Sequence, residues 1–149
     1  KLQEAGVTSA FINAGGDLAF IGGRPDGEPW RVGIRHPHDE NKVIAVLSSL
    51  GGAIVTSGDY EREFEVDGIS YHHIIDPQSG MPARDLASVT IVAHTATAAD
   101  ALSTAVFVLG PQKGLALIEE LPGVEGVLIT PGLEVLVSSG LEGLLELHL

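Results

Sequence analysis

Two short segments of this chain carry side chains that could do chemistry. Residues 71–80 read YHHIIDPQSG, in which His73 precedes Asp76 by three positions. Residues 99–104 read ADALST, in which Asp100 and Thr104 are four positions apart, so that both oxygens would face the same side of a helix. An imidazole can accept a proton near neutral pH, and a carboxylate with a hydroxyl can bind a hard cation. The combination favours chemistry on a phosphorylated ligand.

Each of these side chains also has a plainer interpretation. Asp100 could be the acidic member of a capping box begun by Thr97, while Thr104 packs or bonds back to its own helix. His73 could be a strand histidine bonded to a carbonyl group. Its neighbour His72 must point to the opposite face of a strand, so at most one of the two shares a given site. Asp76 precedes a proline and is more typical of a turn than of an acid catalyst.

Three further segments favour turns and loops. Residues 13–17 (NAGGD) lack the glycine spacing of a dinucleotide fingerprint or a P-loop, which predicts a tight turn. Residues 56–60 (TSGDY) could line a pocket by composition, although a turn is the default. His36 and His38 have a weak zinc-like spacing with no strong third ligand nearby, so we expect a solvated loop there.

Composition narrows the possible ligands. The chain has 149 residues with 20 acidic and 8 basic side chains, a net charge of -12, and such a surface repels nucleic acid. A polyanionic ligand would therefore need a metal ion or backbone N–H groups. The absence of cysteine excludes disulfides and thiolate metal sites. A hydrophobic fraction of 44% argues against disorder, and no apolar run is long enough to span a bilayer.

The hydrophobic pattern predicts an α+β fold with a mainly antiparallel sheet, several hairpins and two consecutive helices. Asp67-Gly68 is the strongest hairpin signal. Thr97 is the expected N-cap of the first helix, which puts Asp100 at its third position, and Pro111 lies in the first turn of the second. The predicted strands are residues 7–13, 18–21, 30–35, 53–57, 61–66, 69–75, 87–94, 124–130 and 133–138, with 42–49 a strand or a short helix, and the predicted helices are 97–109 and 111–121.

In order and spacing, five segments resemble the ApbE family, the FAD:protein FMN transferases: residues 13–17, 30–34, 56–60, 73–80 and 99–104. The resemblance implies Mg²⁺-dependent cleavage of the FAD pyrophosphate. FMN would pass to a threonine or serine hydroxyl on a flavoprotein subunit of a redox complex, and AMP would leave. By motif position, Asp100 and Thr104 would be the metal ligands. His73 would lie beside the flavin as the base, and Ile74 would contact FAD through its main chain.

The resemblance also implies what this chain lacks. Members of the family carry a glycine-rich stretch with a lysine, and an adenine-binding region, before the segment that matches residues 1–6. We therefore expect residues 1–149 to form a single domain, the C-terminal part of an ApbE-like flavin transferase without its N-terminal FAD-binding portion. That portion would belong to a longer protein or to a separate chain. The family is commonly exported and lipid-anchored in bacteria, which implies a periplasmic or membrane-anchored protein. The alternatives are an FAD-binding or scavenging protein, a Mg²⁺-dependent FAD pyrophosphatase, and an inert interaction domain.

Overall fold

The computed structural model describes residues 1–49, 51–60, 63–66 and 69–148. Its centre is a six-stranded sheet in the order β1-β2-β5-β8-β9-β10, and all neighbouring strands are antiparallel. These strands are β1 (Ala10–Ala14), β2 (Asp17–Ile21), β5 (Gly52–Gly58), β8 (Ser88–Ala93), β9 (Glu125–Ile129) and β10 (Val135–Val137). The predicted α+β class with a mainly antiparallel sheet is confirmed.

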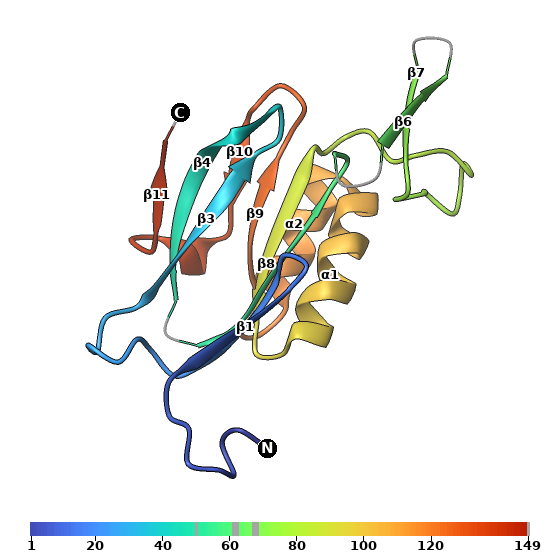
Figure 1. Ribbon diagram of the computed structural model, residues 1–149. Helices are drawn as coiled ribbons and strands as arrows, with labels where there is room; N and C mark the ends of the chain where they lie inside the picture. The colour runs from blue at the N-terminus through green and yellow to red at the C-terminus, as the bar shows by residue number, and fades with distance from the viewer. Residues whose placement is uncertain (50, 61–62, 67–68, 149) are drawn as a thin grey trace.

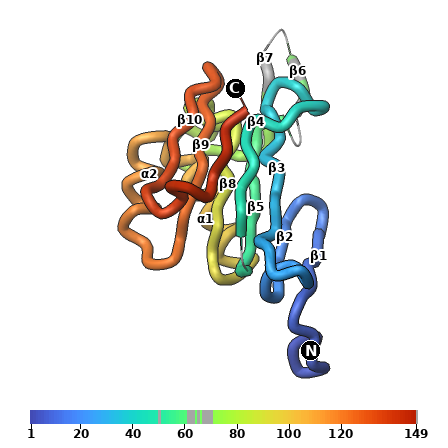
Figure 2. The backbone as a smooth tube through the Cα atoms, turned by 90° about the vertical axis from the view of Figure 1, so that its left-hand side faces the viewer, coloured from blue at the N-terminus to red at the C-terminus, as the bar shows by residue number. Residues whose placement is uncertain are grey.

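Both faces of this sheet are covered, which gives three layers. Helices α1 (Ala96–Leu109) and α2 (Pro111–Glu120) lie on one face (Figure 1). A second sheet, of order β11-β4-β3, covers the other face, and Figure 2 shows it on the side away from the helices. Its strands are β3 (Trp30–His36), β4 (Asp39–Ser49) and β11 (Leu145–Leu147).

Side chains that alternate along the central strands contribute to two hydrophobic cores, one on each face of the sheet. On β5, Val55 packs in the core that contains Phe107 of α1, while Ile54 packs in the core that contains Leu47 of β4. Successive side chains of a strand point to opposite faces, so a strand between two cores must be apolar on both. This explains why β5 and β9 read as nearly continuous apolar runs.

The N-cap of the first helix lies two residues earlier than the sequence predicts. Thr95, not Thr97, is the N-cap, and its hydroxyl accepts the backbone N–H of Ala98 at 3.2 Å. Asp100 therefore lies beyond the first turn, and the capping-box interpretation of this carboxylate is wrong. Gly110, with φ +78°, separates α1 from α2 as expected, because a left-handed backbone ends the first helix.

A small two-stranded sheet, β6 (Glu63–Val66) with β7 (Ile69–His72), projects from the body of the fold (Figure 1). The Asp67-Gly68 turn predicted there lies outside the described residues. The strand expected to reach residue 75 ends at His72, because the backbone N–H of Ile74 bonds to His72 Nδ1 instead of to a neighbouring strand.

Two other differences concern β4 and β11. Residues 42–49 belong to a strand and not to a helix, and β11, which the sequence did not predict, pairs with β4. Among the described residues, no helix has the length and apolarity needed to cross a membrane.

Candidate active site

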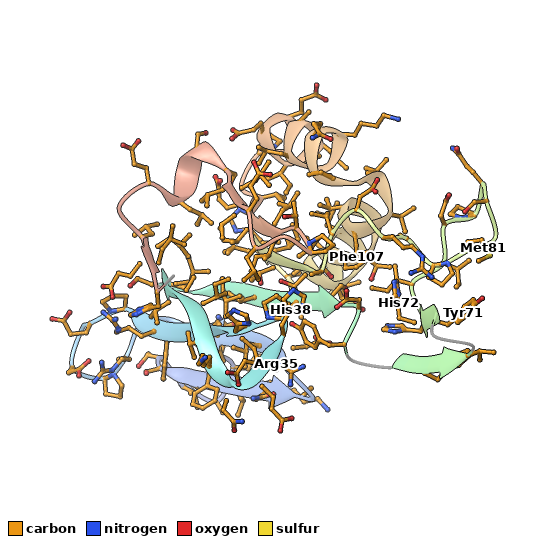
Figure 3. The ribbon with its side chains drawn as sticks, turned by 90° about the horizontal axis from the view of Figure 1, so that it is seen from above. Arg35, His38, Tyr71, His72, Met81 and Phe107 are labelled. Carbon is orange, nitrogen blue, oxygen red and sulfur yellow. The ribbon has the colours of Figure 1, made fainter. Side chains whose placement is uncertain are left out.

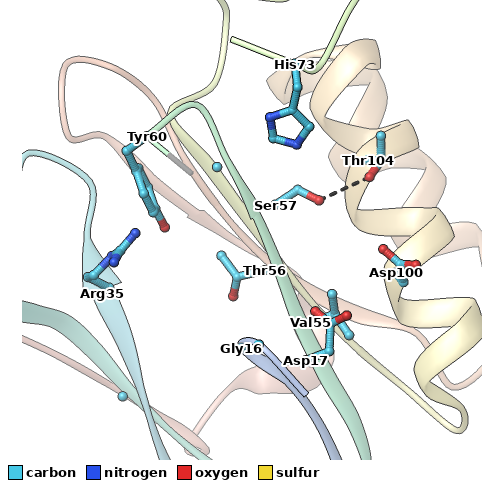
Figure 4. A pocket seen from close by; sticks show the side chains of 13 residues that line it. Gly16, Asp17, Arg35, Val55, Thr56, Ser57, Tyr60, His73, Asp100 and Thr104 are labelled. Atoms are coloured by element: carbon cyan, nitrogen blue, oxygen red, sulfur yellow. Dashed lines mark hydrogen bonds between the residues drawn. The ribbon is translucent and has the colours of Figure 1, made fainter. Parts of the chain in front are cut away.

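A cavity of about 560 Å³ opens beside the C-terminal half of β5, between α1, the β1–β2 turn and the loop after β7 (Figure 4). Segments that are far apart in sequence meet there. The lining residues are Gly15, Gly16, Asp17, Gly33, Arg35, Val55, Thr56, Ser57, Gly58, Tyr60, His73, Asp100 and Thr104. All five segments singled out in the sequence contribute residues to this one cavity, the segment 30–34 through Gly33.

Helix α1 supplies the carboxylate and the hydroxyl. Asp100 and Thr104 both line the cavity, as their four-residue spacing predicts. The intervening Ser103 is fully buried and bonds to Ser57 of β5 at 2.8 Å, and Thr104 bonds to the same serine hydroxyl at 3.2 Å. The helix is thus fixed against the strand at the point where Asp100 and Thr104 face the cavity.

The loop after β7 supplies the imidazole, and His73 is held from both sides. His72 is buried, and its Nε2 donates to the carbonyl oxygen of Ala83 at 2.8 Å while its Nδ1 accepts the N–H of Ile74 at 3.3 Å. The His72 ring also lies edge-on to Phe107 at 5.7 Å (Figure 3). His73 between these anchors is exposed and lines the cavity (Figure 4), so the two histidines face different surroundings, as predicted.

Asp76 is a turn residue, as predicted. Its carboxylate accepts the backbone N–H of Gln78 at 2.9 Å and the N–H of Ser79 at 3.3 Å. The pKa of Asp76 is lowered below its ordinary value, first by the bond from the Gln78 N–H and then by the Ser79 hydroxyl, with a smaller effect of the Ser79 N–H. Asp76 does not line the cavity. Its role is to shape the loop that follows His73.

The wall of the cavity opposite α1 is built by an aromatic ring and a cation. The Arg35 guanidinium lies 4.3 Å from the centroid of the Tyr60 ring, in a cation–π contact (Figure 4). The ring packs closely over Gly58, where an added Cβ would lie 2.6 Å from Tyr60 Cζ. A glycine at position 58 is therefore required for Tyr60 to adopt this position. The pocket interpretation of residues 56–60 is supported over the simple turn.

Backbone atoms of the β1–β2 turn line the cavity beside Asp17. Gly15 and Gly16 have φ values of +72° and +110°, and the N–H of Gly16 donates to Asn13 Oδ1 at 2.9 Å. Residues with side chains rarely adopt such angles, so two glycines are needed for this turn. The predicted tight turn is confirmed, and it also leaves bare backbone facing the cavity.

Not every expected residue lies at the site. The side chain of Ile74 is buried in the core, its N–H bonds to His72, and its carbonyl accepts the N–H of Ala83 at 3.1 Å. Ile74 does not line the cavity, and its contact with FAD stays a prediction. His38 is exposed and bonds to the carbonyl of Pro131 at 2.9 Å, as expected for a solvated loop. Within the described part of the chain, no group of three or more His, Cys, Asp or Glu side chains lies close enough to hold a metal ion by itself.

Arg35 is the functional candidate that sequence reasoning missed. The pairing of β3 with β4 shifts register between Ile34 and Arg35 and again between Arg35 and His36. The extra residues at these shifts lie on β4, while alternation along β3 continues, so Arg35 lies on the same face as Gly33, which also lines the cavity. The alternation of residues 30–35 showed that Arg35 would face away from Ile34, but no local signal shows that this face borders a cavity. Asp17 was counted only as part of a turn.

Comparison with known proteins gives this cavity a family context. The sequence model of the ApbE family matches residues 1–128. The chain belongs to the ApbE family. An FAD:protein FMN transferase of Treponema pallidum is 44% identical over 145 residues, which are 91% of this chain and 40% of that protein. An FAD:protein FMN transferase of Escherichia coli is 42% identical over 119 residues, 78% of this chain and 34% of that protein.

Solved ApbE structures share the fold described above. The ApbE protein of Thermotoga maritima superposes with a TM-score of 0.83 at 40% identity, over 91% of this chain and 44% of that one. The flavin transferase ApbE of Vibrio cholerae gives a TM-score of 0.80 at 32% identity, over 96% of this chain and 46% of that one. The chain therefore spans less than half the length of each of these ApbE relatives.

Proposed function

We propose that this protein transfers FMN from FAD to a hydroxyl group of an acceptor protein, and that the cavity beside β5 holds the reacting groups. The observation that carries the proposal is that His73 and the pair Asp100 and Thr104 line one cavity, although they come from a loop and a helix. That ApbE relatives are named FAD:protein FMN transferases supports the same reaction.

The reaction requires a nucleophile and a base. The acceptor is a threonine or serine hydroxyl, whose oxygen forms a bond to the phosphorus of the FMN half of FAD. The bond from that phosphorus to the bridging oxygen breaks, and AMP leaves with the electron pair. His73 accepts the proton of the attacking hydroxyl. Because His72 and Ile74 are buried on either side, the backbone that carries His73 is held beside the cavity before substrate binds.

The donor atoms at α1 fit a magnesium ion. Asp100 and Thr104 offer oxygen atoms only, and Mg²⁺ commonly binds to one or two carboxylates together with water and phosphate oxygens of a substrate. When bound, Mg²⁺ would neutralise charge on the phosphates of FAD. The protein itself has few cations for this purpose, since its net charge is -12 and Arg35 is the basic side chain among those lining the cavity.

Other parts of the cavity would bind and orient the flavin nucleotide. Tyr60 presents an aromatic ring, and the glycines of the β1–β2 turn present backbone that a ligand can approach closely. Residues outside this chain complete the FAD site in this proposal, and the acceptor is a flavoprotein subunit of a redox complex. A periplasmic or membrane-anchored location would bring the enzyme to such an acceptor.

The test is to incubate the full-length protein with FAD, Mg²⁺ and an acceptor subunit. Flavin fluorescence on the acceptor after denaturing electrophoresis, with release of AMP, is the expected result. Asp100→Ala should reduce the rate by at least about 100-fold, because a charged ligand of the ion is lost. Glu134→Ala is a matched control, because Glu134 is an exposed acid outside the cavity lining.

Two results would overturn the proposal. FAD that stays intact and bound in the presence of the acceptor would indicate a binding or scavenging protein. Free FMN and AMP without labelling of the acceptor would indicate a pyrophosphatase, in which water replaces the protein hydroxyl.

A further inference from the structure

Three hydroxyl groups form a continuous chain between β5 and α1, next to the proposed cation ligands. Ser57 Oγ lies 3.2 Å from Thr104 Oγ1, as Figure 4 shows, and 2.8 Å from Ser103 Oγ. Ser103 Oγ lies 2.9 Å from the backbone carbonyl oxygen of Asp100. These hydrogen bonds thus run from the Thr104 hydroxyl, which lines the cavity, to the backbone carbonyl of Asp100.

The direction of every bond in this chain is determined by its last member. A carbonyl oxygen only accepts, so the single hydrogen of the Ser103 hydroxyl is donated to Asp100 O. Ser103 must therefore accept from Ser57. The hydrogen of Ser57 is then engaged, so Ser57 accepts from Thr104. The single hydrogen of Thr104 points at Ser57.

We infer that Ser57 and Ser103 are positioning residues that orient the Thr104 hydroxyl for cation binding. This inference rests on the proposed function, in which Thr104 is a ligand. A hydroxyl ligand binds a cation through its lone pairs, so its hydrogen must point elsewhere. With the hydrogen directed at Ser57, the lone pairs of Thr104 are available to the ion. Partners beyond the direct ligands commonly orient ligands in this way.

A purely structural role makes a different prediction. Ser103 is fully buried and Ser57 is partly buried, so the bonds between them also join the helix to the sheet. If joining were their whole role, removing the Ser57 hydroxyl would lower stability and leave the cation affinity of the folded protein unchanged. Cation affinity is therefore the measurement that separates the two roles.

The experiment measures Mn²⁺ binding to the full-length protein in the presence of FAD, by electron paramagnetic resonance, with competition by Mg²⁺. Ser57→Ala should weaken binding about 10-fold, a typical cost of losing an orienting partner. Ser57→Thr keeps a hydroxyl on a strand that accepts β-branched residues, and it should restore most of the affinity. Thr104→Val should weaken binding by itself. Ser57→Ala should then have no further effect in the Thr104→Val protein, because the hydroxyl to be oriented is absent.

Controls separate the failure of this inference from the failure of the proposed function. Ser138→Ala removes a buried hydroxyl that bonds to Glu125, away from the cavity, and should leave Mn²⁺ affinity unchanged. Two results would overturn the inference: wild-type Mn²⁺ affinity in Ser57→Ala, or the same loss of affinity from Ser57→Ala in the wild-type and Thr104→Val backgrounds. If Asp100→Ala still abolishes Mn²⁺ binding, the proposed function is unaffected by either result. A wild-type protein that binds no Mn²⁺ with FAD would overturn the inference and the proposed function together.

Discussion

Replacing His72 by phenylalanine should both destabilise the protein and disturb the loop after β7 that carries His73. The substitution keeps a ring against Phe107 but removes both hydrogen bonds of the imidazole. The N–H of the buried Ile74 and the carbonyl of the half-buried Ala83 then lose these partners. Each unsatisfied buried group costs roughly 1–3 kcal/mol, and the longer bond to Ile74 belongs at the lower end. The expected loss of unfolding free energy is about 3 kcal/mol.

Urea-induced unfolding of the full-length protein, followed by circular dichroism, measures this loss. With a slope of about 1–3 kcal/mol per molar urea, the midpoint should fall by at least about 1 M. The rate of FMN transfer should fall as well, because His73 directly follows the loosened residue. His38→Phe is the matched control. His38 is exposed, so its substitution should change the unfolding free energy by no more than about 0.5–1 kcal/mol.

The reasoning would be refuted if His72→Phe unfolded at the same urea concentration as His38→Phe. If a destabilised His72→Phe protein transferred FMN at the wild-type rate, the second part of the prediction, that His72 holds His73 in place, would be refuted. Measuring both quantities on the same sample distinguishes these results, since a rate below the wild-type value counts only where the sample is folded.

Two further predictions concern the wall of the cavity and the loop after His73. Gly58→Ala would place a Cβ 2.6 Å from Tyr60 Cζ, so the ring must move, and FAD affinity measured by flavin fluorescence should fall by up to about tenfold, the value of one aromatic contact. Gly132→Ala, whose nearest atom is 3.9 Å away, should leave the affinity unchanged, and equal affinities in both variants would contradict the argument. The lowered pKa of Asp76 means that the folded state favours the ionised carboxylate. The carboxylate therefore stabilises the fold at pH values above the ordinary pKa of aspartate. This stabilisation is lost as the pH falls through the lowered pKa. The difference in melting temperature between wild type and Asp76→Ala should therefore be largest at neutral pH and shrink in acid, and a difference independent of pH would show that the charge plays no part.

Most of the fold could be predicted because its strands and helices follow local patterns. The alternation on β3 and the Pro-Gly turn before β10 identify strands, and Gly110 with Pro111 marks the junction of the two helices. The N-cap was misplaced because both Thr95 and Thr97 can cap a helix, and local sequence does not choose between them. Strand β11 could not be predicted, since a three-residue strand depends on the surface of β4 on which it packs.

The relative positions of site residues could be predicted only where both residues lie in the same helix or strand. The spacing of Asp100 and Thr104 places them together on any helix, so their common face followed from sequence. Arg35 lies on the same face of β3 as Gly33, but that this face borders a cavity depends on how the second sheet packs on the first, which no local pattern gives. That His73 and α1 meet at the same cavity followed from the family resemblance and not from either segment.

The proposed functional residues share one local arrangement, which links the chemistry of the cavity to the core. Each exposed residue directly adjoins a buried one: His73 follows His72, Asp100 follows Ala99, and Thr104 follows Ser103. A buried neighbour restrains the backbone of the exposed residue, and a reacting group must be held to within about 0.5 Å of its productive position. Stability and activity should therefore be coupled at this site. A substitution that loosens Phe107, for example, would reach His73 through the ring of His72 that packs against it.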